Sequence, residues 1–179
     1  MKKTIFLAAI VLVTMSLTFN NSYAQKGAMA IGGQLGYHIP SDGDNGFGFL
    51  ADFEYMATPD IALCGKIGYT SWVSEKTLGM DVSMSEIPIK VGGKYFFPMS
   101  GSMALFLGAE LGLHMFSTSV TYLGYSSSSS SSEVGLALMG GIHLPLSPQI
   151  DFIGDLKYSF VSDLKYLSIS AGILYRLPK

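Results

Sequence analysis

The sequence predicts an all-β fold, an eight-stranded antiparallel up-and-down barrel, and two observations support this. The 179-residue chain is 49% hydrophobic, contains 21 glycines and has a positive mean hydropathy. Yet beyond residue 24 it has no apolar run of the roughly 18–20 residues that a membrane-spanning helix needs. Instead, apolar and polar residues alternate along eight segments, and this is the period of a β-strand.

The first 24 residues have the three features of a secretory signal peptide. Lys2 and Lys3 form a positive start, residues 5–17 are largely apolar, and Ser22-Tyr23-Ala24 supplies small residues before a cleavage site. An uncleaved anchor is the alternative interpretation. We expect residues 1–24 to be removed on export and residues 25–179 to fold as one domain.

The alternation is clearest in residues 86–97. One parity holds apolar, aromatic or glycine residues, whereas the other holds Glu86, Lys90 and Lys94. Because successive side chains of a strand point to opposite faces, this segment has one apolar face and one charged face. The same division predicts strands at about 27–39, 47–56, 61–72, 82–97, 103–116, 133–144, 150–160 and 165–177.

The eleven charged residues in the bodies of these strands all fall on the less hydrophobic parity. They are Asp52, Glu54, Lys66, Glu86, Lys90, Lys94, Glu110, Asp151, Asp155, Lys157 and Arg176. A closed sheet with this pattern has every charge on one side of its wall and an almost purely apolar surface on the other.

Strand length and connections distinguish a membrane barrel, with its apolar face outward, from a soluble barrel with an apolar core. The predicted strands are longer than the roughly 5–6 residues typical of soluble sheets and match the roughly 9–11 that cross a bilayer. Short connections at 57–60, 98–102 and 145–149 alternate with longer polar ones at 73–81 and 117–132. Outer-membrane barrels combine short periplasmic turns with longer outer loops in this way.

Aromatic residues of the apolar parity gather at both ends of the predicted strands, as in the aromatic girdles of membrane proteins. One end has Tyr55, Tyr95, Phe97, Phe152 and Tyr175, and the other has Tyr37, Phe47, Tyr69, Tyr158 and Phe160. We therefore predict a transmembrane β-barrel over residues 25–179, located in the outer membrane of a Gram-negative cell envelope. A soluble, lipocalin-like periplasmic binder is the alternative.

Residues 86–97, which read Glu-Ile-Pro-Ile-Lys-Val-Gly-Gly-Lys-Tyr-Phe-Phe, resemble a strand of the small outer-membrane protein β-barrel domain family, the OmpA- and OmpX-like barrels. The C-terminal residues Gly172, Tyr175 and Leu177 resemble the signal that the outer-membrane assembly machinery recognises, with Leu177 in place of the usual terminal aromatic. The resemblance implies an outer-membrane location and this assembly partner, but no particular activity.

Eight strands enclose an interior just wide enough for side chains to fill it. We expect a structural polar plug in which Lys66 pairs with Asp52 or Glu86, Lys90 with Glu110, and Asp151 with Arg176, because buried charges require partners. A narrow porin-like path for ions or small solutes is the alternative.

No catalytic, cofactor-binding or metal-binding residues are predicted. His38, His114 and His143 share the inward parity but lie on distant parts of the predicted barrel, so they are expected to make ordinary interior hydrogen bonds. The single cysteine, Cys64, excludes an internal disulfide and is expected to be inert interior packing. A lipid-A modifying enzyme is a further alternative, but no histidine lies on the lipid-facing parity.

The segment 117–132 is the most distinctive predicted loop, with Tyr122, Tyr125 and seven consecutive serines, Ser126 to Ser132. Its composition indicates a flexible, solvent-exposed tip, or alternatively a contact surface for a host, a phage or a surface polymer. Without the two lysines of the leader, 9 of the 11 basic residues remain against 13 acidic ones, which excludes a basic nucleic-acid binder. We predict a structural or surface-interaction protein in contact with outer-membrane lipid and lipopolysaccharide.

Overall fold

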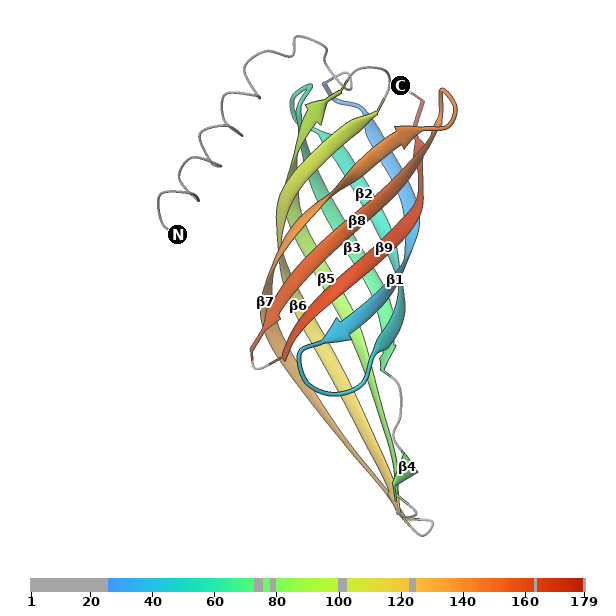
Figure 1. Cartoon of the computed structure of the whole chain (residues 1–179), viewed down its shortest axis with the longest axis vertical. Helices are drawn as coiled ribbons and strands as arrows, with labels where there is room; N and C mark the ends of the chain where they lie inside the picture. The colour runs from blue at the N-terminus through green and yellow to red at the C-terminus, as the bar shows by residue number, and fades with distance from the viewer. Residues whose placement is uncertain are drawn as a thin grey trace.

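The computed structural model describes residues 26–72, 76–77, 80–99, 103–122, 125–162 and 164–178, and the predicted signal peptide lies outside these ranges. The described chain forms a barrel of long, tilted strands, and a narrow sheet projects from one end of it (Figure 1). Within the described residues, no helix is long and apolar enough to cross a membrane.

Eight long antiparallel strands form the wall, and each pairs with its neighbours in the chain. They are β1 (Met29–Pro40), β2 (Gly46–Met56), β3 (Ile61–Trp72), β5 (Met80–Pro98), β6 (Ala104–Tyr122), β7 (Tyr125–Pro145), β8 (Ile150–Val161) and β9 (Leu164–Arg176). Pairing of β1 with β9 and of β3 with β5 closes the sheet on itself. The two-residue strand β4 (Lys76–Thr77) pairs with the first residues of β5. The predicted eight-stranded barrel is therefore confirmed.

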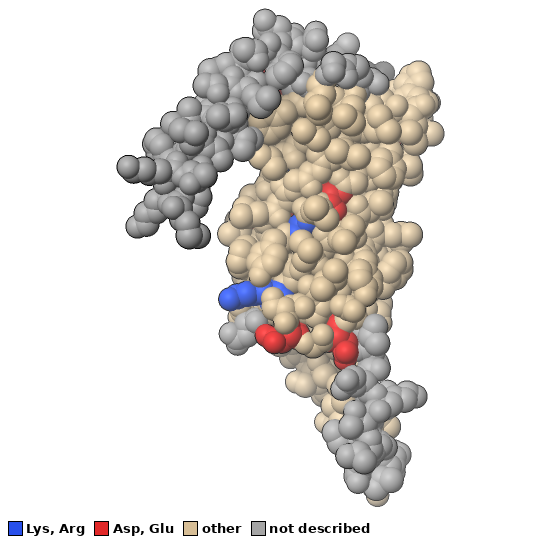
Figure 2. All heavy atoms as spheres, in the orientation of Figure 1, with Lys and Arg blue, Asp and Glu red and all other residues tan. Residues whose placement is uncertain are grey.

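The two faces of the wall have the chemistry that the alternation predicts. Outward side chains are apolar and exposed, with Val91 at 63% and Leu111 at 58%, whereas the intervening residues of β2 and β3 are largely buried. In the space-filling view, charged atoms occupy only a few places on the visible wall (Figure 2). Tyr37, Phe47 and Tyr69 are exposed near the end from which the sheet projects. This exterior suits a hydrocarbon surrounding rather than water.

Glycines on the inward parity allow neighbouring strands to approach closely. A Cβ on Gly92 would overlap the backbone carbonyl oxygen of Ala109, whereas a Cβ on the adjacent, outward Gly93 would meet only the carbonyl of Ala62 at 3.6 Å. Only glycine fits at position 92 without a backbone shift, so Gly92 permits the close approach of the two strands there.

The expectation of a flexible loop at 117–132 is wrong. β6 continues to Tyr122 and β7 begins at Tyr125, so the serine run is one strand of a hairpin. With the start of β5, the hairpin forms a three-stranded sheet beyond the barrel, which we call the arm (Figure 1). The ladder begun in the barrel extends outward because each further pair requires no new loop closure. Part of the predicted 73–81 loop is likewise β4 and the start of β5.

Candidate functional site

The predicted charges of the barrel wall lie inside it. Ten of them are buried: Asp52, Glu54, Lys66, Glu86, Lys90, Lys94, Glu110, Asp151, Asp155 and Lys157. The eleventh, Arg176, is partly buried, with 33% of its side chain exposed. The structure gathers these residues into three groups along the interior.

Glu110 of β6 is the centre of the middle group. Its Oε1 lies 2.9 Å from Lys66 Nζ of β3, and its Oε2 lies 3.0 Å from Lys157 Nζ of β8. Lys66 Nζ is also 3.6 Å from Asp52 Oδ2 of β2, and Asp155 interacts electrostatically with both lysines. One carboxylate therefore bridges opposite sides of the barrel. Each of its oxygens has a cationic partner, as buried charge requires.

A second group lies toward the short turns. Lys94 Nζ donates to Glu54 Oε1, and His143 is near both Glu54, at 3.6 Å, and Asp151, at 4.0 Å. Arg176 donates from Nε and one Nη to the two oxygens of Asp151, at 2.6 and 2.7 Å. This bidentate contact is the Asp151–Arg176 pair that we expected, and bidentate geometry is the strong form of such a pair.

A third group lies toward the arm. His114 Nδ1 is 2.5 Å from Glu86 Oε1, and the Tyr166 hydroxyl donates to the same oxygen at 3.5 Å. Lys90 Nζ lies 6.0 Å from the centre of the Tyr166 ring. The ion pairs of Glu110 are made with Lys66 and Lys157, while Lys90, its expected partner, interacts with it electrostatically. Lys66 pairs with Asp52, one of its two expected partners.

His38 completes this third group. Its Nδ1 is hydrogen-bonded to Ser168 Oγ at 2.7 Å, and its Nε2 is 3.4 Å from Thr70 Oγ1. His38 and Ser168 are both buried inside the barrel. Among the described residues, no cluster of three or more histidine, cysteine, aspartate or glutamate side chains could hold a metal ion.

Apolar side chains fill both ends of the interior, a feature that the charge pattern did not reveal. Near the turns, Phe96 and Phe106 pack with Cys64 and smaller residues. Near the arm, Trp72, Phe116, Val161 and Tyr166 form a second cluster. The sequence signal was available, because these aromatics interrupt the polar parity near strand ends. Apolar side chains are thus interleaved with the charged groups at both ends of the interior, as Lys94 against Phe106 and Glu86 against Tyr166 illustrate.

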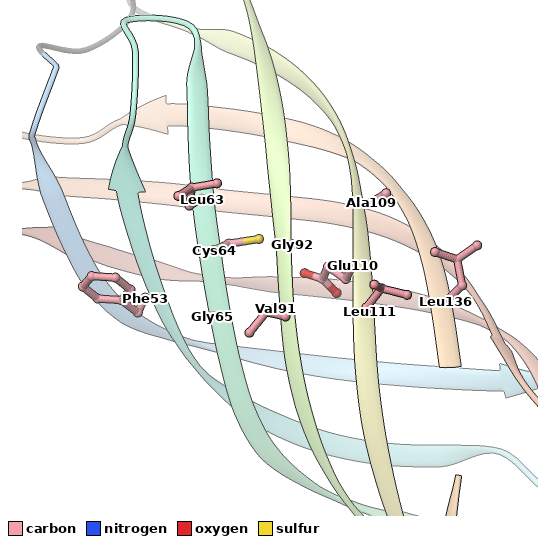
Figure 3. A pocket seen from close by; sticks show the side chains of 10 residues that line it. All are labelled: Phe53, Leu63, Cys64, Gly65, Val91, Gly92, Ala109, Glu110, Leu111 and Leu136. Atoms are coloured by element: carbon pink, nitrogen blue, oxygen red, sulfur yellow. The ribbon is translucent and has the colours of Figure 1, made fainter. Parts of the chain in front are cut away.

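The outer wall carries a shallow apolar depression (Figure 3). Outward side chains of Phe53, Leu63, Val91, Leu111 and Leu136 surround it, and Gly65 lacks a side chain to fill it. Cys64 and Glu110, which also line it, are themselves buried. A depression of this composition suits packing of hydrocarbon chains and offers no group for chemistry.

The arm presents an open sheet edge. β7 pairs with β6 from Tyr125 to His143, but β8 joins β7 only from Gly135 onward. Residues 126–134 therefore have a strand on one side and, in the part of the chain that the structure describes, none on the other. Their side chains are exposed apart from Glu133, and Tyr125 at the tip is 84% exposed.

The predicted assembly signal lies at the closing seam of the barrel. Gly172 and Tyr175 are in β9, opposite Gln34 and Ile31 of β1. The backbone N–H of Leu177 donates to the carbonyl of Met29 at 2.8 Å.

Solved structures with the same fold come from several outer-membrane proteins. The attachment invasion locus protein Ail of Yersinia pestis is 19% identical, covers 86% of this chain and 100% of its own, and has a TM-score of 0.62. Neisserial surface protein A is 21% identical over 84% of this chain and 96% of its own, with a TM-score of 0.59. A major outer membrane protein from Thermus thermophilus is 12% identical over 84% and 99%, with a TM-score of 0.66.

The sequence itself also identifies a family. No curated protein matches the chain, but the profile of the outer membrane protein β-barrel domain matches residues 5–176. A match of this extent, on a closed barrel with an apolar exterior, places the protein in the outer membrane and not free in the periplasm, so the alternative of a soluble periplasmic binder is wrong. The chain belongs to the outer membrane protein β-barrel domain family.

Proposed function

We propose that this protein is a non-catalytic surface-interaction protein whose barrel holds the arm above the outer membrane. The observation that supports this is the open edge of β7 at residues 126–134. Such an edge offers a row of backbone N–H and C=O groups to an extended segment of another protein, which binds as an added strand.

The side chains of the edge favour this use. Natural proteins commonly protect open edges with lysine, proline or a covering segment. Residues 126–132 are all serine, which is small and uncharged, and the first charge along the edge is Glu133. A partner strand can therefore approach along seven residues without steric or electrostatic obstruction. The partner class is an extended segment of a protein on a host cell, a phage or a neighbouring bacterium.

A shortened hairpin tests the proposal. Replacing Thr118–Ser129 by Asn-Gly would join Ser117 to Ser130, which are cross-strand partners, through a favoured two-residue turn. Cells producing either form at equal surface density are compared for adhesion to a panel of immobilised host-surface and matrix proteins. We expect the shortened form to lose adhesion that the full arm supports. Equal adhesion of both forms on every surface would contradict the proposal.

The interior supports a plug and not a channel. The middle group pairs charges across the barrel, and apolar layers lie above and below it. In planar bilayers we expect no steady conductance from the purified protein. Reproducible unitary steps, altered by Glu110→Gln, would instead favour the narrow porin-like path.

Export and insertion complete the proposal. Residues 1–24 are removed as a signal peptide, and Gly172, Tyr175 and Leu177 direct β9 to the outer-membrane assembly machinery. Mass spectrometry of the mature protein would test the cleavage after Ala24. Leu177→Phe should increase the rate of assembly, because it restores the usual terminal aromatic. An unchanged rate would contradict recognition at this position.

A further inference from the structure

The arm has two chemically different faces, and hydroxyl groups predominate on one of them. On the outward parity, Ser71 of β3 pairs with Ser85 of β5, Ser85 pairs with Ser117 of β6, and Ser117 pairs with Ser130 of β7. The next row is Ser83, Ser119 and Ser128, and the row after it is Asp81, Thr121 and Ser126, where Asp81 also pairs with Lys76 of β4. We call the serine and threonine residues of these rows the hydroxyl face: Ser71, Ser83, Ser85, Ser117, Ser119, Thr121, Ser126, Ser128 and Ser130.

The opposite face of the same strands is mixed. β5 and β6 contribute Val82, Met84, Phe116 and Val120 there, and only β7 continues with serines. Val82 and Met84 line a cavity of about 320 Å³ at the barrel mouth, with Trp72 as another wall. The two faces therefore border different surroundings, the mouth on one side and the exterior on the other.

The hydroxyl face continues directly from the membrane-facing wall. Ser71 is the cross-strand partner of Phe47, an exposed aromatic of the outer girdle. Ser85 lies two residues beyond the outward Ile87 on the same strand. Aromatic girdles mark the boundary between hydrocarbon and headgroups. The first serine row therefore begins at this boundary, and later rows follow at about 6.6–6.8 Å intervals along each strand.

Neutral hydroxyl groups dominate the chemistry of this face. All nine of its side chains are neutral donors and acceptors, and neighbouring hydroxyls lie on strands about 4.7–4.9 Å apart. Phosphate groups are held by arginine and lysine, whereas Lys76, the lysine that pairs onto this face, has the acidic Asp81 as its cross-strand partner. Sugars present closely spaced neutral hydroxyls, and they occupy the layer immediately above the acyl chains in a glycolipid leaflet.

We propose that the hydroxyl face binds the saccharide part of the glycolipid in the protein's own outer leaflet, by hydrogen bonds between neutral hydroxyl groups. The sugar chain lies along the outward side of the arm and holds it upright beside the barrel. This inference uses a face of the arm and not its edge, so it does not depend on strand addition at β7.

A matched pair of variants tests the inference. The triple variant Ser126→Ala, Ser128→Ala, Ser130→Ala removes three hydroxyls from the hydroxyl face. The control Ser127→Ala, Ser129→Ala, Ser131→Ala removes three from the opposite face of the same strand. Full-length proteins are reconstituted in phospholipid vesicles that contain either lipopolysaccharide with a complete core oligosaccharide or lipid A alone. The readout is the midpoint of thermal unfolding, measured by heat-modifiable gel migration.

The expected result is a higher midpoint for the wild type with the complete saccharide than with lipid A. The hydroxyl-face variant should lose at least half of this difference, and the control should retain it. An equal midpoint in both vesicles, or equal losses in both variants, would overturn the inference. An equal rise on adding soluble dextran to lipid A vesicles would also overturn it, because the occupant would then be a free polysaccharide.

A second variant guards against misfolding. If the triple variant fails to fold, Ser83→Ala with Ser119→Ala removes two of the three hydroxyls of the middle row from β5 and β6, and β6 is paired on both sides there. This double variant should likewise narrow the difference between the two vesicles. An unchanged difference would count against the proposal.

Discussion

The barrel and the arm share one hydrogen-bonded ladder but are stabilised differently. In the barrel, each inward side chain meets others from across the lumen, as Glu110 meets Lys66 and Lys157. In the arm, the serines of β7 are exposed, and among the described residues one cross-strand side-chain hydrogen bond joins Thr121 to Ser126 at 3.0 Å. The arm is thus held mainly by backbone pairing, whereas the barrel from which it extends is also held by contacts between interior side chains. The same substitution should have very different effects in the two regions.

The largest effect is expected from Glu110→Gln. This change removes the anion between two buried lysines, and uncompensated buried charge costs about 3–5 kcal/mol. The control is Glu133→Gln at the rim, where the carboxylate accepts a 2.9 Å hydrogen bond from Ser162 in an exposed setting. We expect less than about 1 kcal/mol there. Urea unfolding in lipid vesicles measures both, and similar losses would contradict a plug that depends on the middle group.

A smaller but still clear effect is expected from Gly92→Ala. Its methyl group would overlap the Ala109 carbonyl, so the backbone must shift, at a cost of about 1–3 kcal/mol. Gly93→Ala is the matched control, because its Cβ finds only an ordinary contact at 3.6 Å. The control should change the free energy of unfolding by less than about 0.5 kcal/mol. If the two neighbours behaved alike, close strand approach at Gly92 would not limit stability.

Shortening the hairpin should leave the barrel almost unchanged. The segment replaced by Asn-Gly, Thr118–Ser129, lies beyond the interior cluster formed by Trp72, Phe116, Val161 and Tyr166. We expect the free energy of unfolding to change by less than about 1 kcal/mol, since the removed pairs bury little apolar surface. A loss comparable to that of Glu110→Gln would show that the arm is part of the barrel's stability.

The smallest effect is expected from Ser128→Thr within the arm. Threonine keeps the hydroxyl and favours strands, so it should stabilise the local ladder by roughly 0.2–1 kcal/mol. Hydrogen exchange of the arm amides should become slower, while exchange in the barrel stays the same. Ser128→Gly should have the opposite effect on the arm alone. Uniform changes throughout the sheet would indicate that barrel and arm open together.

The same comparison explains what the sequence could predict. In the barrel, lipid and lumen impose opposite chemistries on alternate residues, so strand positions and inward charges such as Lys94 are evident from the pattern. In the arm, β7 carries serines on both faces, so the run Ser126 to Ser132 has no alternation to detect. Its strand structure follows from pairing with Ser117–Tyr122, which is a long-range property.

Which charged residues pair with each other inside the barrel was harder to predict from the sequence. Lys66 and Lys157 meet at Glu110 because their strands face each other across the lumen, and sequence spacing does not determine which strands do so. The Asp151–Arg176 pair was easier to predict, because β8 and β9 are adjacent in the chain. The aromatic layers containing Phe96 and Tyr166 could be predicted only from the aromatic residues that interrupt the polar parity.

The pairing of β1 with β9 also determines the order in which the barrel can close. Ala30 must find Arg176, so the first strand to be synthesised waits for the last one. Contacts so distant in sequence form slowly, and until they form both strands expose unpaired backbone groups. A chain interrupted anywhere before its final residues cannot complete the cylinder. Quality control is therefore inherent in the topology, because only a polypeptide that includes β9 can close the membrane-spanning part of the sheet.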